Sequence, residues 1–144
     1  MSLDVIYTGV QDGVAVDWRG NISLIGFHVH VLRVDAIPAD VRPFLVVALE
    51  ESESNLPGTN VGLAFSVLSP EGDVVFRAEQ PLVSAPRKFP KVPNRYFAAA
   101  QVAFRAPKAG FYNFKVVVSS LGSSPMERSV PVFIGDPESL MEEP

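Results

Sequence analysis

The stretch that decides the fold class is "FRAPKAGFYNFKV", residues 104–116. A Pro-x-x-Gly turn from Pro107 to Gly110 is followed by a segment in which every second residue is apolar, beginning at Tyr112. A period of two places such residues on one face of a β-strand. Greek-key sandwiches often carry a tyrosine at this kind of corner, with its hydroxyl bonded to nearby backbone. Tyr112 could instead be a simple inward aromatic, and both interpretations favour an immunoglobulin-like sandwich over a meandering barrel.

The same period runs through most of the chain, and turn residues interrupt it about every 8–12 residues. We therefore predict an all-β, immunoglobulin-like antiparallel sandwich of about eight or nine strands. It forms one domain over residues 1–136, followed by an acidic tail at 137–144. Pro131 predicts an edge position for the last strand, because proline cannot donate to a ladder. The predicted strands cover residues 13–18, 21–34, 43–51, 61–68, 74–80, 95–106, 111–120 and 127–135.

Composition narrows the function classes. The chain has 144 residues, of which 47% are hydrophobic and 19% charged, so its apolar excess belongs in a large core or under a partner. The net charge of −4 argues against a nucleic-acid partner. The lack of cysteine excludes disulfides, thiolate metal sites and a cysteine nucleophile. Residues 1–13 have no signal-peptide pattern, and no apolar run approaches about 20 residues, which predicts a cytoplasmic protein without a membrane partner.

Three segments together resemble a known family. "DWRGNISLIGFHVHVLRVDAIP" (17–38) is followed by "PFLVVALE" (43–50) and "VGLAFSVLSPEGDVV" (61–75). This order is similar to a small family of uncharacterised bacterial β-sandwich proteins with an Asp-x-x-Gly-Lys-Leu-x-x-Ile-Gly signature and a later Pro-(Asp/Glu)-Gly hairpin. The resemblance covers about residues 14–120, with Asn21-Ile22 where the family has Lys-Leu. It implies the sandwich fold and assigns no activity or site, because the family has no established function.

The strongest candidates for chemistry are His28 and His30, the only histidines of the chain. On a strand they project to one face, about 6.5–7 Å apart, and could share a metal ion. A zinc site needs a third or fourth ligand, which no cysteine or further histidine supplies.

We expect both histidines to be exposed and structural. The core stripe is predicted on Phe27, Val29 and Val31, which leaves the histidines on the outer side with Leu32 and Val34. The chain also has no Gly-x-Ser-x-Gly elbow, no phosphate-binding glycine loop and no calcium-loop pattern. We therefore predict no catalytic residue, no cofactor and no metal ligand beyond this histidine pair.

Two further segments suggest partners. The basic segment 84–95, "SAPRKFPKVPNR", displays Arg87, Lys88, Phe89 and Lys91 between prolines, which suits an acidic protein partner. We favour the alternative that it is an ordinary crossover between the two sheets, in which the prolines prevent edge pairing.

The segment "RYFAAAQVAFR", residues 95–105, predicts self-association. One face carries an inward apolar stripe from Tyr96 to Phe104, whereas a solvated opposite face should be polar. That opposite face instead consists of Phe97, Ala99, Gln101 and Ala103. We predict a two-fold homodimer packed through this face.

Three functions are compatible with the sequence. They are a non-catalytic, self-associating interaction or structural module, a small-ligand carrier or sensor, and a metal-dependent enzyme using His28 and His30. The missing catalytic pattern favours the first and argues against an enzyme, although the fold alone does not decide among them.

Overall fold

The computed structural model of the chain describes residues 3–19, 21–25, 30–51, 60–83, 92–120 and 124–140. Within these ranges the chain forms twelve strands, and the one helical element is a 3-10 turn at Pro137–Leu140. The strands are β1 (Leu3–Gln11), β2 (Gly13–Val16), β3 (Ile22–Ile25), β4 (Val31–Arg33), β5 (Ala39–Val41), β6 (Phe44–Glu51), β7 (Asn60–Leu68), β8 (Val74–Val83), β9 (Asn94–Gln101), β10 (Phe104–Ala106), β11 (Gly110–Ser120) and β12 (Met126–Gly135).

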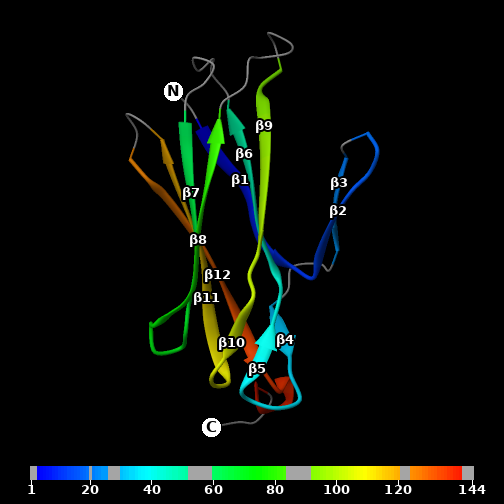
Figure 1. The fold of residues 1–144 in the computed structure, drawn as a ribbon, viewed down its shortest axis with the longest axis vertical. Coiled ribbons are helices and arrows are strands. Elements are labelled where there is room, and N and C mark those ends of the chain that lie inside the picture. Colours follow the sequence, from blue (N-terminus) through cyan, green and yellow to red (C-terminus); the bar gives the residue numbers. More distant parts are fainter. Residues whose placement is uncertain are drawn as a thin grey trace.

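Two sheets make up the body of the molecule. The three-stranded sheet has the order β1–β6–β9, and the five-stranded sheet has the order β4–β12–β11–β7–β8. All of these pairs are antiparallel except β4 with β12. Figure 1 shows the two sheets as facing layers, with the separate β2–β3 hairpin standing to one side. The predicted all-β sandwich is confirmed.

The space between the sheets is filled by the residues that alternate inward. Burying a large apolar side chain contributes roughly 1.5–3 kcal/mol, which makes this core the main stabilising feature. The ring of Phe104 lies 5.7 Å from that of Tyr112 and 6.1 Å from that of Phe114. The predicted inward stripe of the 95–105 segment is confirmed, because its members line this core. The largest fully buried apolar side chains are Tyr112, Phe65, Phe114, Leu45, Leu49, Leu63 and Ile134.

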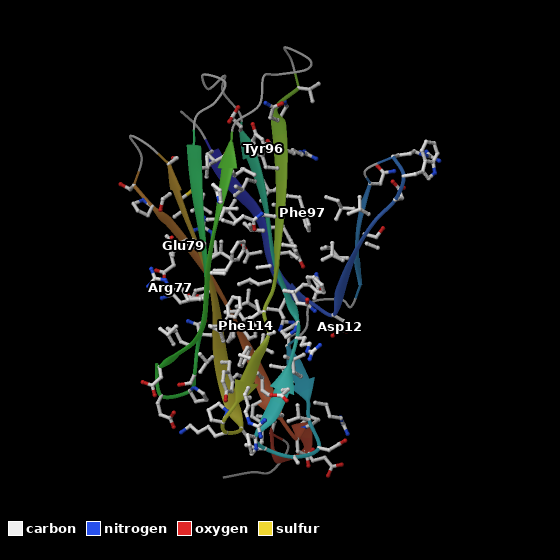
Figure 2. The ribbon with its side chains drawn as sticks, viewed as in Figure 1. Asp12, Arg77, Glu79, Tyr96, Phe97 and Phe114 are labelled. Carbon is white, nitrogen blue, oxygen red and sulfur yellow. The ribbon has the colours of Figure 1, made fainter. Side chains whose placement is uncertain are left out.

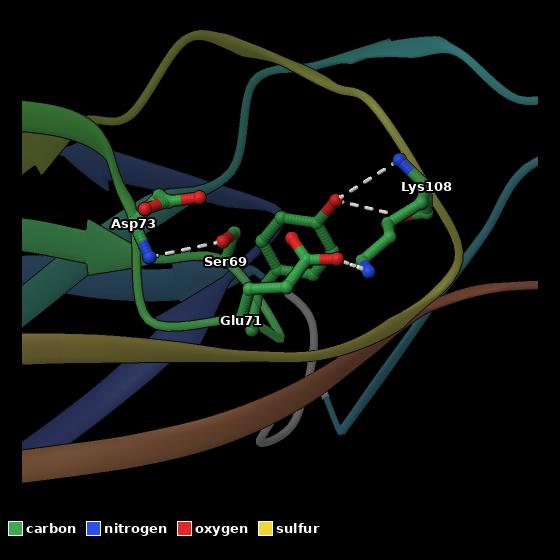
Figure 3. Close-up of polar contacts among 5 residues, drawn as sticks. Ser69, Glu71, Asp73 and Lys108 are labelled. Atoms are coloured by element: carbon green, nitrogen blue, oxygen red, sulfur yellow. Dashed lines mark hydrogen bonds and ion pairs between the residues drawn. The ribbon is translucent and has the colours of Figure 1, made fainter.

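The tyrosine corner is confirmed at the turn before β11. The hydroxyl of Tyr112 donates to the carbonyl oxygen of Lys108 at 2.6 Å and lies 3.4 Å from the Lys108 nitrogen. The neighbouring β7–β8 turn approaches the same place, where Glu71 forms an ion pair with Lys108 (Figure 3). A Cβ on Gly110 would also lie only 2.6 Å from Pro70. The two turns therefore pack together at this end of the sandwich.

The strand count differs from the prediction for two reasons. Two predicted strands are each divided, and β1 and β5 were not predicted at all. The alternation in β1 is interrupted by a bulge between Val5 and Tyr7, which hides its period. The 95–106 segment divides at Val102, whose nitrogen donates to the carbonyl oxygen of Pro43 at 2.7 Å, so that β10 can pair with β5.

The predicted faces around β4 are wrong. Val31 is exposed, whereas Leu32 and Val34 pack against the core. The period does not run unbroken from residue 21 to residue 34, because β3 ends at Ile25 and β4 begins at Val31. β4 then pairs parallel to the end of β12, and this pairing sets which of its side chains face inward.

The predicted edge position of the last strand is wrong, because β12 lies between β4 and β11 in its sheet. Pro131 itself nevertheless lies outside the β4 pairing. Pro131 lies opposite Asn113 of β11, and the β4 pairing covers only residues 133–135 of β12. Among the described residues, the other side of β12 at Pro131 therefore has no strand partner.

Candidate interaction surface

The strand register assembles an apolar surface on the side of the β1–β6–β9 sheet that faces away from the core. Residues directly opposite each other on neighbouring strands share a face. One cross-strand row joins Gly9, Val46 and Ala99. We refer to this surface as the outer face. It comprises Tyr7, Gly9, Gln11, Phe44, Val46, Ala48, Phe97, Ala99 and Gln101.

Part of the outer face is covered by the chain itself. The ring of Tyr7 lies over Gly9, so close that a Cβ there would overlap the tyrosine hydroxyl. The side-chain nitrogen of Gln11 donates to this hydroxyl at 2.5 Å, and Gln11 is buried. Val46, in the centre, is fully buried although it does not belong to the core between the sheets. The β1 side of the outer face is therefore closed, and the β9 side is the open part.

The structure brings three of the four predicted interface residues onto this open part. Phe97 and Ala99 are half-buried and Gln101 is exposed, all on the outer face of β9. Figure 2 shows Phe97 on the side of β9 toward which the β2–β3 hairpin stands. Ala103 is exposed but lies beyond the end of the strand, between β9 and β10. The division of the predicted strand thus separates Ala103 from the other three.

One ion pair borders the outer face at its end. The Nε atom of Arg95 lies 2.9 Å from an oxygen of Glu50, which is opposite it on β6. The next residue, Glu51, points to the other side of the strand and is buried. The hydroxyl of Tyr96 lies 3.5 Å from its carboxylate. The two adjacent glutamates therefore face opposite sides of the sheet and do not form a carboxylate pair.

The β2–β3 hairpin carries a second apolar surface that sequence reasoning missed. Val14 pairs with Leu24 and Val16 with Ile22, which places these four side chains on one face. Val16 is 64% exposed, and Ile22 and Leu24 are also exposed. The signal was present in the sequence as apolar residues at 14, 16, 22 and 24, although a two-stranded hairpin by itself is only marginally stable in water.

The turn at the tip of this hairpin is held by hydrogen bonds between a side chain and the backbone. The Oδ1 atom of Asp17 accepts hydrogen bonds from the backbone nitrogens of Arg19 and Asn21, both at 2.8 Å. The hydrogen bond from Asn21 is the main reason why the pKa of Asp17 is lowered. Trp18 is 88% exposed, and the Arg19 guanidinium lies 4.9 Å from its ring centre. The tip therefore displays an aromatic side chain on a backbone that hydrogen bonds hold in place.

The remaining predicted site residues do not form a described site. His28 and the basic residues Arg87, Lys88, Phe89 and Lys91 lie outside the described residues. His30 is exposed just before β4, where its carbonyl oxygen accepts a hydrogen bond from the nitrogen of Phe133 at 2.9 Å. Among the residues that the structure describes, no three His, Asp or Glu side chains gather closely enough to hold a metal ion.

A shallow groove lies on the opposite side of the molecule, over β7, β8 and β11. Its volume is about 360 Å³, at the lower end of the range for small-molecule sites. Gly62, Ala64, Glu79, Pro81 and Ser119 are among the residues that line it.

Comparison with solved structures finds distant likenesses, of which one is described here. No protein-family model and no curated protein matches the sequence. One solved structure, described as "putative beta-galactosidase from bacteroides fragilis", aligns with a TM-score of 0.49 and 16% sequence identity. The alignment covers 68% of this chain and 14% of that one, so the chain spans a small part of that protein. The resemblance to an uncharacterised bacterial family stays a prediction.

The prediction that the protein has no membrane partner can be compared with the structure on one point. Across the described ranges, no helical segment has the length and apolarity needed to cross a membrane.

Proposed function

We propose that this protein is a non-catalytic interaction module that associates with a second copy of itself through the open part of the outer face. The observation that carries the proposal is the apolar character of this surface. Phe97 and Ala48 form one of its cross-strand rows, and Ala99 and Val46 form the next. Sheets with a solvated outer side normally alternate apolar and polar residues.

The five-stranded sheet of the same molecule provides the contrast. Its outward side carries Lys115, which pairs with Glu127 at 2.5 Å, and Arg77, which pairs with Glu79 at 3.3 Å. Ser66 lies opposite Lys115 on β7. This outer side therefore mixes charged and polar residues with apolar ones, among them the Phe111–Phe133 pair. The difference between the two sheets supports a partner for the β1–β6–β9 side.

The test is the mass of the native protein and of single glutamate variants. We expect native mass spectrometry and sedimentation at tens of micromolar to report a dimer. Phe97→Glu and Ala99→Glu should each give a monomer, because an unpaired carboxylate is costly to bury. Ser66→Glu, on the outward side of the other sheet, is the matched control and should stay dimeric. A parent protein that is monomeric under these conditions would refute the proposal.

A small-ligand carrier is the second candidate, supported by the groove over β7, β8 and β11. In the described part of the sandwich, the side chains of Phe65, Tyr112 and Phe114 occupy the interior. Native mass spectrometry of the same preparation tests this candidate. A co-purifying mass that is lost in a Gly62→Trp variant would favour the carrier, and a bare polypeptide mass would count against it.

A further inference from the structure

We propose that the two copies meet edge to edge along β9, with the two β9 strands antiparallel and Ala98 opposite the partner's Ala98. This inference rests on the proposed self-association and specifies its geometry. The contact runs along the β9 border of the open part, where Phe97 and Ala99 lie beside the partner strand, so that the outer faces of the two copies continue into one another. The partner is a second copy of this chain, and the contact is a strand ladder that extends the sheet.

The first observation is that β9 is the last strand of its sheet in the described part of the chain. It lies at the end of the order β1–β6–β9, and among the described residues β6 is its strand partner. Its register with β6 is continuous from Asn94 to Gln101, without a bulge. Residues 96–100 read Tyr-Phe-Ala-Ala-Ala and contain no charge and no proline. Such an edge is a template for pairing with another strand.

The other edges of the two main sheets have features that oppose pairing. β8 carries Arg77, Glu79 and Pro81, and Figure 2 shows Arg77 and Glu79 pointing away from the sandwich. β1 contains the bulge next to Tyr7, and β4 is only three residues long. Charges, proline, bulges and short length are the usual means of blocking edge-to-edge pairing. Within the described structure, β9 has one of these features, the charge of Arg95 near its start, and its residues 96–100 have none of them.

The second observation is that the sequence of β9 is complementary to itself. With Ala98 at the two-fold axis, Phe97 faces the partner's Ala99 on the outer side of the sheet. Tyr96 faces the partner's Ala100 on the inner side. Each aromatic ring is therefore beside an alanine methyl group and has room, and cross-strand pairs of this kind stabilise a sheet.

Charge also permits this register. Arg95 is the only charged residue of β9, and it would face the partner's Gln101. The two arginines would lie at opposite ends of the paired strands, and each already has Glu50 at 2.9 Å. Like charges directly opposite each other would destabilise the pair, and this arrangement has none.

Because the chain contains no cysteine, single cysteines can test this geometry. The Cα atoms of directly opposite residues are about 4.5–5.5 Å apart in antiparallel strands, within the range of about 4.4–6.8 Å for a disulfide. Ala98→Cys should therefore give a disulfide-linked dimer under mild oxidation. Ala100→Cys is the matched control on the same strand and face. Its two copies would be about 13 Å apart along the strands, and it should stay unlinked.

The outcomes separate the two proposals. A linked Ala98→Cys dimer with an unlinked Ala100→Cys protein confirms the edge pairing. A native dimer in which Ala98→Cys stays unlinked overturns this register but leaves self-association intact, whether Ala99→Cys or Ala100→Cys links instead or neither does. A monomeric parent overturns both.

If a cysteine variant fails to fold, a measurement on the unmodified protein still tests the edge pairing. The backbone amides of residues 96–100 should exchange more slowly at tens of micromolar than at high dilution. Equal exchange at both concentrations, in a protein that remains dimeric at the higher one, would also overturn the edge pairing.

Discussion

The hydroxyl of Tyr112 donates a 2.6 Å hydrogen bond to the carbonyl oxygen of Lys108, four residues earlier in the chain. Tyr112 is fully buried, so its hydroxyl needs a partner inside the protein. The bond connects the β10–β11 turn to the first core residue of β11. It is the structural counterpart of the Pro-x-x-Gly-x-Tyr pattern in the sequence.

We expect Tyr112→Phe to lower the free energy of unfolding by about 1–3 kcal/mol, because the Lys108 carbonyl loses its donor inside a packed corner. Urea denaturation would measure this change. Phe111→Tyr, at the exposed neighbouring position, is the control and should stay within about 0.5 kcal/mol of the parent. Equal stability of Tyr112→Phe and the parent would show that the hydrogen bond between Tyr112 and Lys108 makes no net contribution to the stability.

The same tyrosine should make the fold sensitive to alkaline pH. Burial raises the pKa of Tyr112 above its ordinary value of 10.0, with the backbone hydrogen bond to Lys108 opposing the effect. The folded protein then holds the phenol proton more tightly than the unfolded chain does. This stabilisation is complete below about pH 10 and is lost as the pH rises through the folded-state pKa. Stability above pH 10 should fall more steeply in the parent than in Tyr112→Phe, and parallel curves would contradict this.

We expect substitution of Gly72 to lower the free energy of unfolding, because its backbone conformation is unfavourable for other residues. Its φ angle is 92°, and no atom lies within 4 Å of where a Cβ would stand. Gly72→Ala therefore causes no clash, and left-handed backbone alone should destabilise the fold by about 1–2 kcal/mol. Gly72→Asn should recover part of this loss, because asparagine tolerates that conformation better. Guanidinium denaturation of the two variants checks the order, and an alanine variant as stable as the parent would refute it.

The histidines should bind no metal. We expect elemental analysis of the purified protein to find no stoichiometric zinc, nickel or iron. About one ion per chain, lost in the His28→Ala/His30→Ala double variant, would instead support a metal-dependent enzyme.

The basic segment gives a prediction about acidic partners. Charge reversal at Arg87, Lys88 and Lys91 should change stability by less than about 0.5 kcal/mol if these residues are exposed. If the segment is a docking surface, the parent should be retained on immobilised polyglutamate at low salt and the triple variant should not. Equal retention of both proteins would identify the segment as a crossover only.

The sequence by itself determined the elements that depend on neighbouring residues. The alternation after Gly110 and the turn before it predicted β11 and the corner at Tyr112. The alternation in residues 95–105 predicted which side of β9 faces the core. These features follow from the sequence because side-chain direction in a strand repeats every two residues and needs no knowledge of distant segments.

Only the tertiary structure decided how distant segments cover one another. Gly9, Val46 and Ala99 are far apart in the chain, and their row exists because β6 lies between β1 and β9. The ring of Tyr7 covers Gly9 within this pairing. β9 ends before Ala103 because the backbone nitrogen of Val102 donates a hydrogen bond to the carbonyl oxygen of Pro43. Strand order, edges and exposed faces are set by long-range pairing and burial, which a period of two does not encode.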